Sequence, residues 1–322
     1  MSDMRFDGRV AIVTGAGGNP GLGREYALLL ASRGAKVLVN DLGVGPDGRG
    51  AVTDYGPEAV VAEIVAAGGE ALPNFDTVAT PDGAQRIVDQ AMSTWGRVDI
   101  VINNAGIAPF ALFDELSPEQ IERVIAVHLF GHMWMSRSVW PIMKQQGYGR
   151  LISVSSKVAV MGMPLQSAYA AAKSGIVGFT RVLAAEGIPF GIKANVLLPA
   201  ADTLAWQTML EPAFSEQAQA NGVVPSAVAP VAAYLAHEDC DFSGKLIETQ
   251  AGAVKEIFYS TTVGIAADPH LTLESLASHI CDVINRDGSD AFSDPTGKVS
   301  PNLVPQPRRS SLIRTDHSDA IT

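Results

Sequence analysis

Short apolar runs alternate along the chain with longer segments in which apolar residues recur every three to four positions. The runs are rich in Val, Ile and Leu and have few polar positions, which is typical of strands covered on both faces of a sheet. Six runs have this character: RVAIVTG, AKVLVNDL, EALPNFD, VDIVINNAG, GRLISVSS and IKANVLLPA. We predict that each of them is a strand.

The segments between these runs have helical spacing, and most of them end in glycine, a residue that commonly ends a helix. The predicted helices cover residues 23–34, 56–69, 82–96, 117–147 and 167–187. Alternation of strand and helix predicts an α/β fold, a doubly wound parallel sheet of the Rossmann type flanked by helices. GKLIETQAG at 244–252 adds one further strand, which we expect at an edge of the sheet.

The pattern changes after about residue 255. Residues 272–288 predict one more amphipathic helix, opened by Thr272 with Glu274 in its first turn. Beyond it, Pro, Ser and charged residues dominate, a composition typical of disorder. We therefore predict a single globular domain over 1–255, a C-terminal helical extension over 256–290 and a disordered tail over 291–322.

Composition narrows the range of partners. The 322-residue chain is 47% hydrophobic and has a net charge of −11, and its one basic cluster, PRRSS, lies in the tail. Nucleic acid and anionic membranes are therefore not expected as partners. No apolar run has the length of a signal sequence or a membrane span, so we expect a cytoplasmic protein. Cys240 and Cys281 are isolated, and no spacing of Cys and His predicts a metal site.

The first predicted strand leads directly into a glycine-rich turn, TGAGGNPGLG, and a helix follows. Glycine at such a turn permits positive φ, close approach of a pyrophosphate and tight packing of helix on strand. The N–H groups at the start of the helix would then bind the phosphates. We predict a dinucleotide-binding domain over 1–255, with an ordinary turn as the alternative. The residues expected at the cofactor are Gly15, Gly21, Leu22 and Gly23.

Polar residues follow the second, third and fourth predicted strands. Asp41 can accept hydrogen bonds from both ribose hydroxyls of NAD and would repel the 2′-phosphate of NADP. No basic residue lies between Gly15 and Gly21 to offset this repulsion, so NAD is the expected cofactor. The alternative for Asp41 is a turn residue at a strand end. Asp76 and Thr77 are expected near the adenine, and Asn104 is expected to tie the cofactor side to the sheet.

SAYAAAKSG at 167–175 places Tyr169 and Lys173 four residues apart, on one face of a helix. Such a pair is common by chance. The spacing alone leaves open whether it is a phenol activated by an ammonium group or only a surface contact.

The TG…GLG turn, NNAG, YAAAK and the SS pair thirteen residues before the tyrosine together resemble the short-chain dehydrogenase/reductase family, over residues 5 to about 250. The resemblance implies an enzyme that interconverts a secondary alcohol and a ketone with NAD. Ser156 would hold the substrate oxygen and Tyr169 would transfer the proton. Lys173 would bind the nicotinamide ribose, with Tyr169 also at the cofactor, and would lower the phenol pKa. Pro199 is also expected at the nicotinamide.

FDGRVAIVTGAG, VNDLG, VHLFG, YGRLISVSS and LAHEDC are similar to the (3R)-hydroxyacyl-CoA dehydrogenase part of the peroxisomal multifunctional enzyme, a group that includes 17β-hydroxysteroid dehydrogenases. This similarity implies a 3-hydroxyacyl-CoA as the small-molecule substrate, with a hydroxysteroid as the alternative. It also implies a homodimer or homotetramer, built on the apolar helix 117–147. A catalytically silent nucleotide-binding regulator is the alternative from another class, and the intact Ser156, Tyr169 and Lys173 argue against it.

Two positions depart from the family pattern. His128 stands where the family usually has Asn, and that Asn supports a water in the proton relay. We expect His128 either to take over this role or only to pack. PAADT replaces the usual Pro-Gly after the sixth strand. In the segment that follows, 203–214, apolar residues at helical spacing predict a lid over the substrate, with core packing as the alternative. These residues are Trp206, Met209, Leu210 and Phe214.

Overall fold

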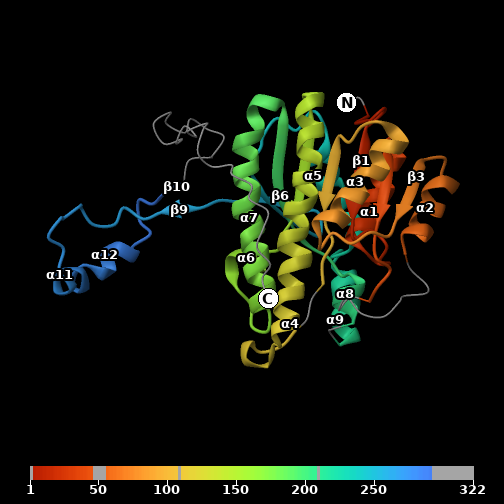
Figure 1. Cartoon of the computed structure of the whole chain (residues 1–322). Helices are drawn as coiled ribbons and strands as arrows, with labels where there is room; N and C mark the ends of the chain where they lie inside the picture. Colours follow the sequence, from red (N-terminus) through yellow and green to blue (C-terminus); the bar gives the residue numbers. More distant parts are fainter. Residues whose placement is uncertain (1–2, 46–55, 108–109, 209–210, 292–322) are drawn as a thin grey trace, which may run out of the picture.

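The computed structural model describes residues 3–45, 56–107, 110–208 and 211–291. Within these residues, eight strands form one sheet in the order β3-β2-β1-β4-β5-β6-β7-β8 (Figure 1). Neighbouring strands are parallel, except that β8 is antiparallel to β7. The strands are β1 (Val10–Thr14), β2 (Lys36–Asn40), β3 (Glu70–Asn74), β4 (Ile100–Asn103), β5 (Gly149–Val154), β6 (Ile192–Ala200), β7 (Leu246–Gln250) and β8 (Ala253–Ile257). The predicted doubly wound α/β fold is confirmed.

Helices cover both faces of this sheet, because alternate residues of each strand point to opposite faces. Ala11 and Val13 of β1 pack into one core, and Val10 and Ile12 pack into the other. The first core contains residues of α1 (Leu22–Ser32), α2 (Pro57–Ala66) and α10 (Ala229–Ala236), and the second contains residues of α3 (Pro81–Trp95), α5 (Gly131–Gln146) and α7 (Ser167–Gly187). Burial on both faces explains the lack of alternating polar positions in the strand sequences.

Local sequence signals determine where several helices begin and end. The Thr80 hydroxyl caps α3 by accepting a hydrogen bond of 3.2 Å from the Gly83 N–H, and Gly96 ends that helix at φ 73°. Ser117 caps α4 (Pro118–Val124) in the same way. The predicted helix 117–147 is present, but it contains a π-helical turn, η2 (Ile125–Phe130), between α4 and α5. Nothing in its apolar spacing predicted this turn.

The predicted strand at 244–252 is present as β7, but it is not the edge strand. Ala251 and Gly252 both have positive φ, 48° and 79°, and form a two-residue turn of the kind that joins twisted antiparallel strands. The turn brings β8 back against β7, with Gln250 opposite Ala253. The expectation of an edge position was therefore wrong, because it did not include this hairpin.

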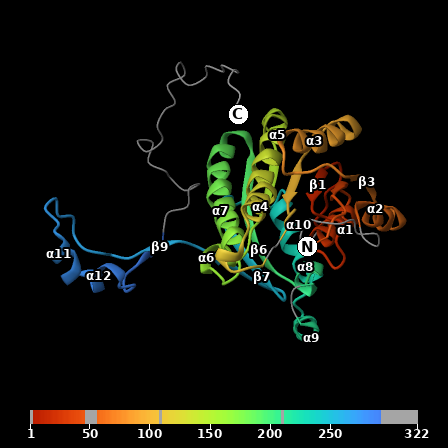
Figure 2. The ribbon, with the colours of Figure 1, turned by 60° about the horizontal axis from the view of Figure 1, so that its bottom comes forward.

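Residues after β8 extend away from the sheet as an arm (Figures 1 and 2). The arm contains β9 (Ser260–Thr261), α11 (Leu273–Ser278), α12 (Ile280–Ile284) and β10 (Asp290–Ala291). Thr272 caps α11, as predicted, and its hydroxyl accepts a hydrogen bond from the Ser275 N–H. The predicted single helix is divided in two, because His279 leaves the helical conformation with ψ 10°. The proposed domain boundary at 255 falls inside β8, and the predicted tail beyond residue 291 lies outside the described residues.

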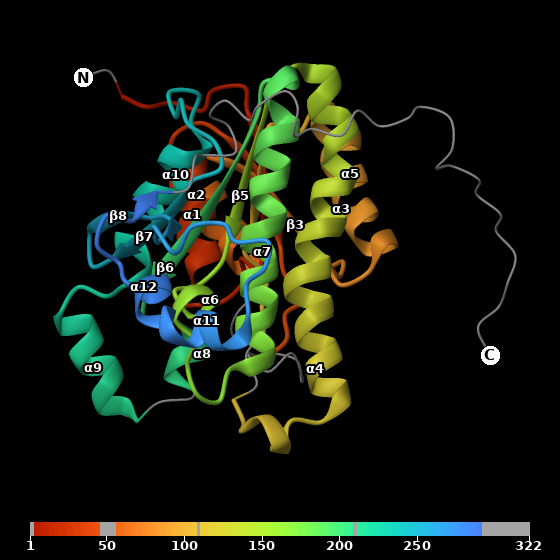
Figure 3. The ribbon, with the colours of Figure 1, turned by 90° about the vertical axis from the view of Figure 1, so that its left-hand side faces the viewer.

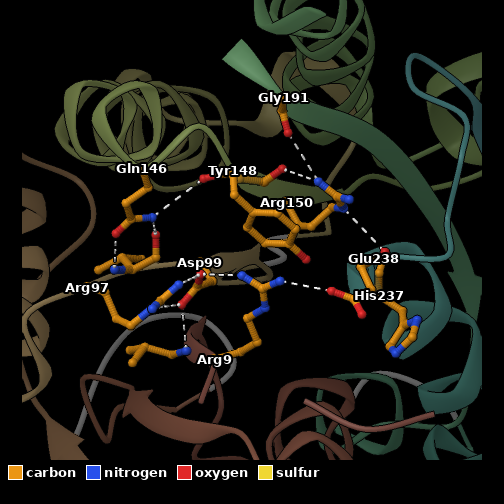
Figure 4. A network of polar contacts seen from close by, with 12 residues as sticks. Arg9, Arg97, Asp99, Gln146, Tyr148, Arg150, Gly191, His237 and Glu238 are labelled. Carbon is orange, nitrogen blue, oxygen red and sulfur yellow. Dashed lines mark hydrogen bonds and ion pairs between the residues drawn. The ribbon is translucent and has the colours of Figure 1, made fainter. Parts of the chain in front are cut away.

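A polar network joins β1, β4 and β5 near the amino ends of these strands (Figure 4). The Asp99 carboxylate is fully buried and accepts hydrogen bonds from the Arg9 and Arg97 guanidinium groups, at 3.1 and 2.7 Å. The Tyr148 ring lies between two guanidinium groups, with Arg9 at 3.8 Å and Arg150 at 4.3 Å from its centroid. These residues do not line the cavity described below. We infer that the network stabilises the sheet.

In the part of the chain that the structure describes, no helix is both long and apolar enough to cross a membrane. Within the same residues, no group of three or more His, Cys, Asp or Glu side chains is arranged to hold a metal ion.

Candidate active site

A cavity of about 890 Å³ opens where the strands of the sheet end. The chain order of the strands reverses between β1 and β4, and the carboxyl ends of parallel strands at such a switch point form the usual ligand crevice. Except for Gly23, all the residues predicted for the site line this cavity. Helices α6 (Val158–Met161), α8 (Leu204–Gln207) and α9 (Pro212–Ala220) gather at the same end of the sheet (Figure 3).

The glycine turn forms one wall of the cavity, and its glycines have different roles. Gly15 has φ 64°, and a Cβ there would lie 2.6 Å from the Ala105 Cα. Gly21 precedes α1, and a Cβ there would lie 2.3 Å from the Gly18 carbonyl oxygen. Gly23 is buried behind the turn, where a Cβ would lie 2.4 Å from the Gly15 carbonyl oxygen. Gly23 is therefore needed for packing the turn on the helix, and it does not line the cavity.

Asp41 lies at the end of β2 and is held by two backbone N–H groups. Its Oδ2 accepts a hydrogen bond of 2.8 Å from Gly17, and its Oδ1 accepts one of 2.8 Å from Gly43. The bond from Gly17 joins the glycine turn to the end of β2. Each carboxylate oxygen can accept a further hydrogen bond, so the group can still bind two hydroxyls at the cavity wall.

Asp76 and Thr77 follow β3 and line the same wall. The Asp76 carboxylate accepts hydrogen bonds from the Arg86 guanidinium, at 2.6 Å, and from the Asn74 side chain, at 3.1 Å. Asn104 donates from its side chain to the Thr14 and Gly15 carbonyls, at 3.0 and 2.8 Å. Asn104 therefore ties the glycine turn to the end of β4.

Ser156, Tyr169 and Lys173 all line the cavity. Tyr169 and Lys173 lie one turn apart on α7, and Ser156 follows β5. Burial raises the pKa of Tyr169 to about 12, and a hydrogen bond with the Ser156 side chain opposes this effect. Burial also lowers the pKa of Lys173 to about 7, and its ammonium donates to the Val154 carbonyl at 2.7 Å.

The charge on Lys173 was expected to lower the phenol pKa. In this structure burial has the larger effect, and the pKa of Tyr169 is raised instead. Lys173 lies 5.5 Å from the centroid of the Tyr169 ring, and its own charge is weakened by the same buried setting. The group with a pKa near neutrality at this site is therefore Lys173.

His128 is buried in the π-helical turn and packs edge-on against Tyr169, with the ring centroids 5.1 Å apart. Its Nε2 contacts both the N–H and the carbonyl oxygen of Ile107, at 3.0 and 2.6 Å, while its Nδ1 has no partner among the described residues. Burial and the charge of Lys173 lower its pKa well below the usual value. The imidazole is therefore neutral near neutral pH.

Two features of this region were missed from the sequence. A Cβ at Gly106 would lie 2.3 Å from the His128 ring, so the glycine of NNAG makes room for the imidazole. His132, one turn further along the helix, is also buried, and its Nε2 has no partner among the described residues. Packing was one of the two roles expected for His128, but the dependence of this packing on Gly106 was not expected.

Apolar side chains also line the cavity, among them Pro199, Trp206 and Phe214. Trp206 and Phe214 are 41% and 62% exposed, so they line the mouth of the cavity and are not part of the core. Their positions on α8 and α9 agree with the predicted lid. Met209 and Leu210 lie outside the described residues.

Comparison with known proteins adds the following similarities. The family model for short chain dehydrogenase matches residues 9–209. A short-chain type dehydrogenase/reductase of Mycobacterium tuberculosis is 40% identical over 281 residues, which cover 87% of this chain and 96% of that protein. The structure of full-length peroxisomal multifunctional enzyme type 2 from Drosophila melanogaster is 32% identical with a TM-score of 0.73, and the match covers 90% of this chain but only 48% of that one.

A second solved structure is similar in fold and contains a cofactor. It is a 7α-hydroxysteroid dehydrogenase complexed with NADH and 7-oxo glycochenodeoxycholic acid, with 26% identity and a TM-score of 0.68. The match covers 78% of this chain and 98% of that one.

Proposed function

The chain belongs to the short-chain dehydrogenase family, and from this premise we propose that it is an NAD-dependent enzyme interconverting a 3-hydroxyacyl-CoA and the 3-oxoacyl-CoA. The observation that carries the proposal is the convergence of Ser156, Tyr169 and Lys173 in the same cavity as the glycine turn and Asp41. One cavity thus holds both the residues suited to alcohol oxidation and those suited to a dinucleotide.

The cavity fits a nicotinamide dinucleotide on one side and a secondary alcohol on the other. Gly15 and Gly21 line the cavity without side chains, and Asp41 offers acceptor oxygens at the wall. When bound, NAD accepts the hydride from the carbon that bears the hydroxyl. Ser156 holds the substrate oxygen and Tyr169 removes the hydroxyl proton. Lys173 exchanges protons with Tyr169 near neutral pH, because its pKa is about 7.

The charges of the described residues support NAD over NADP. The cations that line the cavity are Arg123, Lys157 and Lys173, and each follows β4 or a later strand in the chain. Asp41 follows β2, and no described Lys or Arg from β2 to α2 lines the cavity. Arg24 on α1 is bound by Glu25 and Glu63. A 2′-phosphate at Asp41 would therefore meet a carboxylate without a compensating cation among the described residues.

The choice of an acyl-CoA as substrate rests on the similarity to the multifunctional enzyme and on the apolar side chains that line the cavity. The match to the multifunctional enzyme covers 90% of this chain, and Trp206 and Phe214 offer apolar surface to an acyl chain. The neighbouring hydroxysteroid dehydrogenase makes a hydroxysteroid the second candidate. A catalytically silent regulator is disfavoured, because it has no need of the three catalytic side chains together.

A substrate panel tests these assignments. Purified protein is incubated with NAD or NADP and with 3-hydroxyacyl-CoA thioesters of several chain lengths or with hydroxysteroids, and the absorbance of the reduced nicotinamide is followed. The proposal expects the highest kcat/KM with a hydroxyacyl-CoA and NAD. Turnover of steroids alone would favour the second candidate, and no turnover with any alcohol would favour the regulator.

We also propose a homo-oligomer, dimer or tetramer. Helices α5 and α7 lie side by side on one face of the molecule (Figures 1 and 3). Met133, Trp134 and Trp140 of α5 are only partly buried in the single chain, and Val182 of α7 is 54% exposed. Contact with a second copy would bury this apolar surface.

A further inference from the structure

Asp202 is a buried carboxylate without a cationic partner. It follows β6 directly, is 5% exposed, and forms no ion pair with any residue in the described ranges. Burying a charge is unfavourable unless hydrogen bonds replace its hydration. The hydrogen-bond partners of Asp202 therefore indicate its structural role.

All three side-chain partners of Asp202 come from the segment that covers the mouth of the cavity. Its Oδ2 accepts hydrogen bonds from the Gln207 and Gln219 amides, at 2.9 and 2.8 Å, and its Oδ1 accepts one from the Ser215 hydroxyl, at 2.9 Å. Gln207 ends α8, while Ser215 and Gln219 lie one turn apart on α9. Burial would raise the pKa of Asp202, but these three bonds outweigh it and lower the pKa, so the acceptor stays ionised.

The same segment is also bonded to the glycine turn. The Leu204 N–H, at the start of α8, donates to the Pro20 carbonyl at 2.8 Å. Pro20 lies in the glycine turn, directly before Gly21. The segment with α8 and α9 is thus attached to the glycine turn at its start and to Asp202 along its length.

We propose that Asp202 is a positioning residue that fixes α8 and α9 over the cavity and so sets the affinity for the substrate. Trp206 of α8 and Phe214 of α9 line the cavity, and each is adjacent in sequence to a hydrogen-bond partner of Asp202. Without the carboxylate, three donors lose their shared acceptor and both aromatic side chains lose their fixed place. The substrate side of the cavity then loses its shape while the catalytic residues keep theirs.

The test uses Asp202→Asn, Ser215→Ala and Gln219→Ala, with Glu216→Ala as the matched control. Glu216 is exposed on the same helix and does not line the cavity. The first measurement is hydrogen exchange of backbone amides in the full chain with NADH present. In Asp202→Asn, one oxygen is replaced by an amide that cannot accept, so we expect exchange in 212–220 to accelerate about tenfold or more, with the sheet unchanged.

The second measurement is the split between KM and kcat, and it rests on the proposed function. For the hydroxyacyl-CoA substrate we expect KM to rise about tenfold in Asp202→Asn, with kcat and the Kd of NADH nearly unchanged. The single variants Ser215→Ala and Gln219→Ala should show smaller effects of the same kind. The double variant Asp202→Asn with Gln219→Glu exchanges donor and acceptor and should restore much of the lost affinity.

The outcomes are distinguishable. If wild-type protein turns over no hydroxyacyl-CoA, the proposed function fails, but hydrogen exchange still decides the role of Asp202. Unchanged exchange in 212–220, or equal acceleration throughout the sheet, would overturn the positioning role. So would a double variant that shows the summed defects of its two changes without any rescue.

Discussion

Asp41→Ala tests the choice of cofactor at a single side chain. The change removes a carboxylate that lies at the cavity wall after β2, held by the N–H groups of Gly17 and Gly43. In the proposed complex it also removes the acceptor for the ribose hydroxyls and the charge that repels a 2′-phosphate. We expect the preference to shift from NAD towards NADP.

The magnitude follows from the number of hydrogen bonds. A hydrogen bond to a charged group contributes about 1.5–3 kcal/mol, and 1.4 kcal/mol corresponds to about a factor of ten. Loss of one such bond to the ribose should lower kcat/KM for NAD about 10-fold to 100-fold. The value for NADP should stay level or rise, because its binding gains from the loss of the negative charge. The ratio of the two should therefore fall at least about tenfold.

The assay measures kcat/KM with each cofactor at saturating alcohol. Asp41→Asn is the informative companion, because it keeps one acceptor for the Gly17 and Gly43 N–H groups but removes the charge. Asp82→Ala, at an exposed site on α3, controls for loss of a carboxylate away from the cavity. If both cofactors lose the same factor in Asp41→Ala, the residue only supports the turn, and the reasoning for NAD is refuted.

Five further predictions concern catalysis, pH dependence, stability and assembly. Tyr169→Phe should lower turnover by at least about 100-fold while the Kd of NADH, measured by fluorescence, stays nearly constant, because only the transferable proton is lost; activity within tenfold of wild type would contradict the role. The rate of ketone reduction should fall as the pH rises through about 7, where Lys173 loses the proton that replenishes Tyr169. The variant His128→Asn should show the same fall, because the imidazole is already neutral in this range. If the fall disappeared in His128→Asn, the titrating group would be His128. His128→Leu should lose activity that His128→Asn retains, since leucine cannot hold a water, and full activity of the leucine variant from pH 6 to 9 would end the relay idea. Asp99→Ala should lower the free energy of unfolding in urea by about 1–3 kcal/mol, because it leaves the buried Val10 N–H without its acceptor, whereas Asp7→Ala at an exposed pair should change it far less. Sedimentation at micromolar concentration should show a dimer or tetramer, and a 33.8 kDa species alone would refute the oligomer.

The predictable part of the fold is the part with a strong local pattern. The six strands are short apolar runs, and the long helices have a clear period and recognisable caps such as Thr80 and Ser117. Helix α10 was missed because it is short and almost entirely apolar, so it has no polar face to show a period. Strand β8 was missed because most of its residues are exposed, and its pairing depends on a turn in which Ala251 takes positive φ without the usual Asn or Gly.

The residues of the site were predictable under the same condition. Motifs of adjacent residues, such as the glycine turn and the Tyr169–Lys173 pair, are visible in the sequence because their chemistry needs a fixed spacing. Contacts between distant segments are not visible in this way. The hydrogen bond from the Gly17 N–H to Asp41 joins residues 24 positions apart. The contact between Gly106 and His128 depends on the π-helical turn that contains His128.

The directions of the pKa shifts could not be predicted from the sequence for a related reason. The spacing of Tyr169 and Lys173 correctly suggested two groups that share a face, but the direction of each pKa shift depends on how much water the fold excludes. Burial raises the pKa of Tyr169 from 10.0 to about 12 and lowers that of Lys173 from 10.5 to about 7, which moves the two values apart. Since the buried imidazole of His128 is neutral, Lys173 is left as the group whose protonation changes near neutral pH. A bound dinucleotide would exclude still more water from this pocket, so we expect it to change the balance between lysine and phenol further.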